Sequence, residues 1–153
     1  MVSRKDLGSW LEGAPSDQSY PGQRMGRPQT GPGAIARPGR RLAAFWIDWL
    51  LVQGLFLLLA RGPLAGIDSV ALDISQILVF WAYLVASVGF MGHSLGHLLL
   101  GMQVQTLDGR PVGWLTALIR QSLVMFLLPV VLMDADQRGL HDRARNSILI
   151  MIR

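Results

Sequence analysis

Residues 41–60 read RLAAFWIDWLLVQGLFLLLA, and this stretch decides the class of the fold. Sixteen of the nineteen residues from 42 to 60 are apolar. A helix of that length is about 29 Å long, which matches the roughly 30 Å hydrocarbon core of a bilayer. It begins too late in the chain for a cleaved signal peptide. We therefore predict a retained transmembrane helix over residues 42–60.

Two further apolar stretches follow. Residues 70–91 hold seventeen apolar residues in twenty-two and predict a second span, antiparallel to the first because only a short turn joins them. Residues 112–133 hold sixteen in twenty-two, but Arg120 and Pro129 interrupt them. This third segment is either a full crossing or a kinked, re-entrant helix. The prediction is an all-α membrane protein that forms a small transmembrane helical bundle.

Short strand-like runs flank the third segment. Residues 102–106 alternate around Val104 and precede the turn-forming Asp108-Gly109, and residues 147–152 form a β-branched run. If the two runs pair as a two-stranded β element near the membrane surface, they must lie on one side of the membrane.

The overall composition agrees with a membrane protein. The 153 residues are 51% hydrophobic and 16% charged, with a mean hydropathy of +0.38. The net charge of +4 comes entirely from the first 41 residues, which carry seven Lys or Arg and three acids. Cations at the ends of apolar runs predict a cytoplasmic N-terminus and argue against nucleic-acid binding. A third full crossing would place the C-terminal arginines outside, against the same rule. The absence of cysteine excludes disulfides and thiolate sites.

The first 40 residues differ from the rest, since twelve of them are Gly or Pro. We separate them as an N-terminal extension from a membrane domain over residues 41–153. The extension is either a disordered cytoplasmic tail or a segment that lies against its own bundle or a partner.

Three separated motifs carry a resemblance to a known family. They are RLAAFWID at residues 41–48, GHSLG at residues 92–96 and RGLHDR at residues 138–143. Together they resemble the RDD family of small membrane proteins, which is named for one arginine and two aspartates. The Pro21–Gly33 stretch further resembles the N-terminal extension of actinobacterial members.

The resemblance implies that the signature residues are Arg41, Asp48 and Asp142. Secondary positions of the family's motifs match Gly92, Ser94, Gly96, Gly101 and His141. The chain departs from the family at Ser94 and His97, where Thr and Lys are frequent, and at Asn146-Ser147, where Gly-Thr is. The family is commonly suspected of transport and has no general biochemical assignment.

Asp48 is the most unusual residue of the first span. An isolated ionised carboxylate at the membrane interior costs about 2.5–3.5 kcal/mol on insertion scales, so it must be neutral, hydrated or paired. It is either an ion or proton site, or one half of a packing ion pair with Arg120 or with Arg41. We predict a buried unit of Asp48 and Arg120, because each lies alone in an apolar segment.

Metal and catalytic sites receive little support. His93 and His97 have the i,i+4 spacing of zinc ligands on a helix, but two ligands do not close a site. His141-Asp142 resembles half of a catalytic pair, yet no nucleophile stands in a recognisable motif. We expect no metal, no cofactor and no enzymatic activity.

With the resemblance, the predicted function is that of a non-enzymatic, multi-pass protein of a bacterial plasma membrane. It acts as an accessory or assembly component of a membrane complex or as a homo-oligomer, with the bilayer and other membrane proteins as partners. The alternative is a transporter or ion antiporter built around Asp48. A transporter should leave the Asp48 carboxylate accessible and without a tight partner. An accessory subunit should show that carboxylate fully satisfied.

Overall fold

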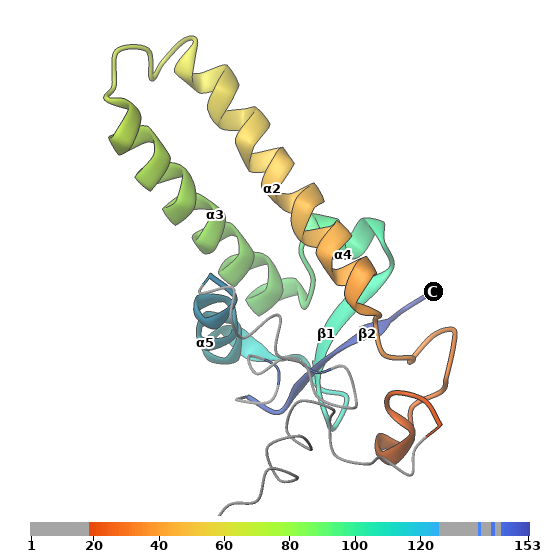
Figure 1. Cartoon of the computed structure of the whole chain (residues 1–153). Coiled ribbons are helices and arrows are strands. Elements are labelled where there is room, and N and C mark those ends of the chain that lie inside the picture. The colour runs from red at the N-terminus through yellow and green to blue at the C-terminus, as the bar shows by residue number, and fades with distance from the viewer. Residues whose placement is uncertain (1–18, 126–137, 139–141, 143–144) are drawn as a thin grey trace, which may run out of the picture.

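The computed structural model describes residues 19–125, 138, 142 and 145–153. A long helical hairpin rises from a group of short elements at one end (Figure 1). In chain order the elements are η1 Gln23–Met25, α2 Pro38–Ala60, α3 Ser69–Met91, α4 Leu95–Leu99, β1 Met102–Thr106, α5 Gly113–Met125 and β2 Ser147–Met151. The predicted class, a small helical membrane protein with a two-stranded sheet, is confirmed.

The hairpin consists of α2 and α3, each 23 residues and therefore about 34 Å long. Within the described residues, these are the two helices long and apolar enough to cross a membrane. Pro38 opens α2, where its missing N–H costs nothing. The Asp68 carboxylate caps α3 by accepting from the backbone N–H of Val70 at 3.0 Å and of Ala71 at 3.2 Å. Gly92, with φ of 75°, ends α3 in the left-handed conformation.

Helix α5 runs antiparallel to α3 and packs along it. Trp114 lies against Gly89, where an added Cβ would be 3.1 Å from the Trp114 Cα. Two turns further along both helices, Trp81 donates from Nε1 to Ser122 Oγ at 3.2 Å. The remainder of the predicted segment 112–133 lies outside the described residues.

The sheet pairs β1 with β2 in antiparallel register, with Met102 opposite Met151 and Thr106 opposite Ser147. This pairing was predicted and is confirmed. Residues 33–36 continue the sheet on the free side of β2: Gly33 N–H donates to Met151 at 2.7 Å, and Ala36 N–H donates to Leu149 at 2.9 Å. Because β1 precedes α5 and β2 follows it, the chain leaves and returns at the same end of the hairpin.

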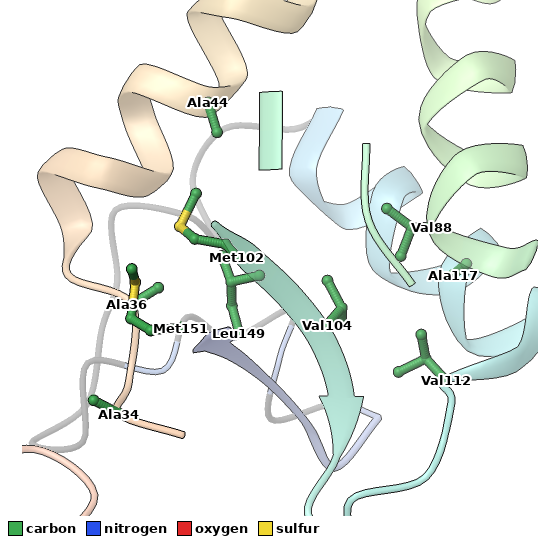
Figure 2. Packing of buried hydrophobic residues seen from close by; sticks show 10 residues of the cluster. All are labelled: Ala34, Ala36, Ala44, Val88, Met102, Val104, Val112, Ala117, Leu149 and Met151. Atoms are coloured by element: carbon green, nitrogen blue, oxygen red, sulfur yellow. The ribbon is translucent and has the colours of Figure 1, made fainter. Parts of the chain in front are cut away.

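Both faces of β2 are covered, so all five of its residues are buried. Ile148 and Ile150 pack against Ile35, which belongs to the N-terminal extension. The other face joins a cluster that receives side chains from α2, α3, α5 and both strands (Figure 2): Ala34, Ala36, Ala44, Val88, Met102, Val104, Val112, Ala117, Leu149 and Met151.

We use the name cap for residues 19–37, 92–112 and 145–153. The shared cluster holds the cap to the base of the hairpin, and it brings the motifs of the sequence together there. Residues 1–18 of the predicted extension, and His141, lie outside the described residues.

Candidate functional site

Asp48 is only 1% exposed and lies ten residues, or about 15 Å, after the start of α2. Its Oδ1 accepts from the Tyr83 hydroxyl at 2.8 Å and from the Gly96 N–H at 2.8 Å. Its Oδ2 accepts from the Ser94 hydroxyl. Three donors from α3 and the start of α4 therefore surround this carboxylate.

The same groups satisfy the first turn of α4. A helix begins with backbone N–H groups that have no partner inside the helix. Here Leu95 N–H donates to Tyr83 Oη at 2.9 Å, Gly96 N–H donates to Asp48, and His97 N–H donates to Ser94 Oγ at 3.2 Å. The carboxylate also complements the positive end of the helix dipole. Asp48 thus fixes α4 against the side of the hairpin.

Glycine at position 96 makes the close contact between α4 and α2 sterically possible. A Cβ at this position would lie 2.2 Å from the Ala44 carbonyl oxygen and 2.9 Å from Asp48 Oδ2. Only glycine lets α4 approach the backbone of α2 closely enough for its N–H to reach the carboxylate. Gly92, by contrast, ends α3, and of these two glycines it is Gly96 that contacts α2.

His97 completes a chain of hydrogen bonds with Ser94 and Asp48. Its Nδ1 accepts from the Ser94 N–H at 3.3 Å and lies 2.7 Å from Ser94 Oγ. Burial, which is the largest cause, and the positive charges of Arg120 and Arg41 together lower the pKa of His97 to about 3, against a smaller opposing effect of Asp142. The imidazole is therefore neutral near pH 7, with Nδ1 free to accept.

His93 and His97 do not share a helix, contrary to the spacing argument. His93 lies in the turn after α3, whereas His97 belongs to α4. Among the residues that the structure describes, no three His, Cys, Asp or Glu side chains form a metal-binding group.

A second cluster forms around Asp142, whose side chain is fully buried. Arg41 Nη1 lies 2.8 Å from Asp142 Oδ2, and Arg120 Nε lies 2.8 Å from Oδ1. Arg41 also donates from Nε to the Ala36 carbonyl at 2.8 Å. One carboxylate therefore joins the first turn of α2, the middle of α5 and the segment that leads into β2.

The predicted ion pair between Asp48 and Arg120 is wrong. Arg120 pairs with Asp142, and Asp48 is satisfied by neutral donors. The reason lies in the path of the chain. Helix α4 folds back onto α2 and its donors bind the Asp48 carboxylate, whereas the segment that leads into β2 brings Asp142 to Arg120. The pairing of Arg41 with Asp48 does not form either, since Arg41 reaches Asp142.

Three further residues were missed by sequence reasoning. Tyr83 binds Asp48, and the side-chain amides of Gln53 and Gln76 pair with each other between α2 and α3. The available signal was a polar group inside an apolar run, because such groups need partners within a bilayer. Gly101, a predicted secondary residue, has φ of 66° and packs under the Arg153 side chain.

Chemically, the two clusters are closed. The acceptors of Asp48 and Asp142 are engaged by donors of this chain, and the Ser94 hydroxyl, which lies 2.7 Å from His97 Nδ1, is itself fully buried. Such an arrangement positions helices relative to one another.

Comparison with known protein families gives one match. The model of the RDD family matches residues 35–146, a range that contains Arg41, Asp48, Arg120 and Asp142. A comparison with curated proteins and one with solved structures each find no match.

Proposed function

The chain belongs to the RDD family of membrane proteins, and from this premise we propose that it is a non-enzymatic component of a bacterial plasma membrane that acts by association with other membrane proteins. In this proposal α2 and α3 both cross the bilayer, and the cap lies on the cytoplasmic side.

The observation that carries the proposal is the state of Asp48. A carboxylate that loads and releases a cation needs free acceptor positions and a path to water. Asp48 is 1% exposed and already accepts from Tyr83, Ser94 and Gly96. Its role as an anchor for α4 accounts for an otherwise costly buried charge. This favours association over transport.

The charge distribution supports the orientation. The cap contains six arginines and one aspartate, whereas the turn of residues 61–68 at the other end of the hairpin contains one of each. Pairing of β1 with β2 keeps both ends of the intervening segment on the cap side. The C-terminal arginines then stay on the cytoplasmic side, so the topology no longer conflicts with the positive-inside rule.

The hairpin offers the surface for association. Its exposed side chains are apolar along most of its length, and the polar exceptions are Arg40 at the start of α2 and Ser69 and Asp73 near the start of α3. Leu58 is 70% and Phe90 86% exposed. In a bilayer the apolar part of this surface contacts either lipid or another protein.

Two measurements test the proposal. In the first, the purified full-length protein is reconstituted into vesicles and cation and proton flux is recorded. We expect no flux above that of protein-free vesicles. Flux that disappears in Asp48→Asn but persists in the control Asp108→Asn, whose side chain is exposed, would establish the transport alternative.

In the second, a photo-reactive residue replaces Leu58 in cells, with the buried Val52 as the control position. Association predicts discrete protein adducts from position 58 and none from position 52. Adducts with lipid alone would overturn the proposal.

A further inference from the structure

Helix α4 has two unlike sides. Ser94, which caps it, and Gly96 face Asp48 and the base of the hairpin. Its three leucines point outward instead, with exposed fractions of 43% for Leu95, 42% for Leu98 and 62% for Leu99. A short helix that hides its polar groups and exposes leucine is suited to an apolar surrounding.

The position of α4 along α2 defines the depth of this leucine face. Gly96 lies against the Ala44 carbonyl, as the close approach described above requires. Arg40 precedes Ala44 by four residues, so it lies one turn closer to the start of α2 on the same face. The leucine face therefore begins about 6 Å further along the helix than Arg40.

Cations border this face on the cap side. Arg37 and Arg40 are exposed, and Arg40 Nη1 lies 3.4 Å from Met151 Sδ. Arg153 donates from Nη2 to the carbonyls of Leu98 at 3.3 Å and Leu99 at 2.6 Å, at the end of α4. Figure 1 shows the end of β2 beside the start of α2 and beside α4.

No acidic side chain balances these arginines locally, as far as the described part of the chain extends. The one aspartate of the cap, Asp108, lies in the turn after Thr106, whereas Met151 pairs with Met102 at the opposite end of the sheet. Asp142 is buried between Arg41 and Arg120.

We propose that α4, Arg37, Arg40 and Arg153 form a binding site for an anionic phospholipid of the leaflet on the cap side. The acyl chains lie against the leucines, and the phosphate lies at the arginines. The inference rests on the proposed crossing of the bilayer by α2, which places Arg40 at headgroup level and the leucines below it.

The order of the two surfaces selects a lipid over a soluble anion. A free phosphate would bind the arginines but would leave the leucines uncovered. A phospholipid carries its charge at headgroup level and its hydrocarbon deeper in the bilayer, which is the order of the arginines and the leucines here. A basic residue near an anionic surface contributes about 1 kcal/mol, which is roughly a five-fold change in affinity. Loss of two arginines should thus reduce binding about 25-fold.

The test uses the full-length protein, purified in mild detergent with equal amounts of phosphatidylglycerol and phosphatidylcholine, and native mass spectrometry of the retained lipid. We expect selective retention of phosphatidylglycerol by the wild type and its loss in Arg37→Gln/Arg40→Gln. The matched control, Arg24→Gln/Arg110→Gln, removes two exposed arginines elsewhere in the cap and should retain the lipid. Arg153→Lys keeps the charge and should also retain it.

Three outcomes would overturn the inference: equal retention of both lipids, equal loss in the test and control variants, or displacement of the lipid by millimolar inorganic phosphate. Thermal unfolding of each variant separates loss of lipid from loss of fold. Because the lipid is measured on the isolated chain, its absence leaves the flux and photo-crosslinking results of the proposed function intact.

Discussion

Asp142→Asn should destabilise the fold strongly, because it removes the carboxylate that joins α2 and α5 at the base of the hairpin. The Asp142 carboxylate is fully buried and lies 2.8 Å from a nitrogen of Arg41 and 2.8 Å from a nitrogen of Arg120. Asparagine has the same shape but no charge, so both guanidinium groups lose the attraction of the Asp142 carboxylate while they remain largely buried. Removal of one partner from a buried ion pair costs about 3–5 kcal/mol, and here the partner is shared by two cations.

Substitution of Arg120 should lower the free energy of unfolding by a smaller amount. In Arg120→Gln the carboxylate keeps Arg41, so the loss is closer to that of one charged hydrogen bond, about 1.5–3 kcal/mol. In the Asp142→Asn background Arg120→Gln should cost less still, because the residue has already lost its acceptor. The coupling energy of the pair should fall within about 0.5–3 kcal/mol.

The assay is unfolding of the full-length protein by a denaturing detergent, followed by tryptophan fluorescence and circular dichroism. The same cycle with Asp48→Asn in place of Asp142→Asn serves as the comparison. Asp142→Asn within about 1 kcal/mol of the wild type would refute the reasoning. Stronger coupling of Arg120 to Asp48 than to Asp142 would also refute it.

Three further predictions concern Gly96, His97 and the orientation of the hairpin in the membrane. Gly96→Ala should destabilise the protein by at least about 1–3 kcal/mol in the same unfolding assay, because its Cβ would overlap the backbone of α2, whereas the control Gly54→Ala, which has open space, should be neutral or stabilising. The free energy of unfolding should fall as the pH drops from about 6.5 towards 3, because in this range His97 binds a proton in the unfolded chain but not in the folded chain. His97→Gln should flatten this pH profile. Since the sequence contains no cysteine, Asp108→Cys and Ala65→Cys should be labelled by a membrane-impermeant maleimide from the cytoplasmic and the outer side respectively.

Each of these predictions has an outcome that contradicts it. An unchanged unfolding midpoint in Gly96→Ala would show that α4 and α2 are not in close contact. Identical pH profiles with and without the imidazole would remove His97 as the titrating group. Labelling of both cysteine variants from one side would contradict the crossing by the hairpin.

The sequence by itself determined the elements that depend on local pattern. The length and apolarity of residues 42–60 and 70–91 predicted α2 and α3, and the short connection predicted their antiparallel packing. The β-branched run after Asn146 predicted β2 and its partner. These features follow from a stretch of neighbouring residues, and local geometry is sufficient to fix them.

Only the tertiary structure decided which polar residues meet. A lone Asp48 or Arg120 in an apolar run shows that a partner is needed, because an unpaired charge is costly there, but it does not identify that partner. The answer depends on two returns of the chain, one that brings α4 to Asp48 and one that brings Asp142 to Arg120. The cost of an unpaired charge is a property of a single residue, whereas the partner that removes this cost depends on which distant segments pack together.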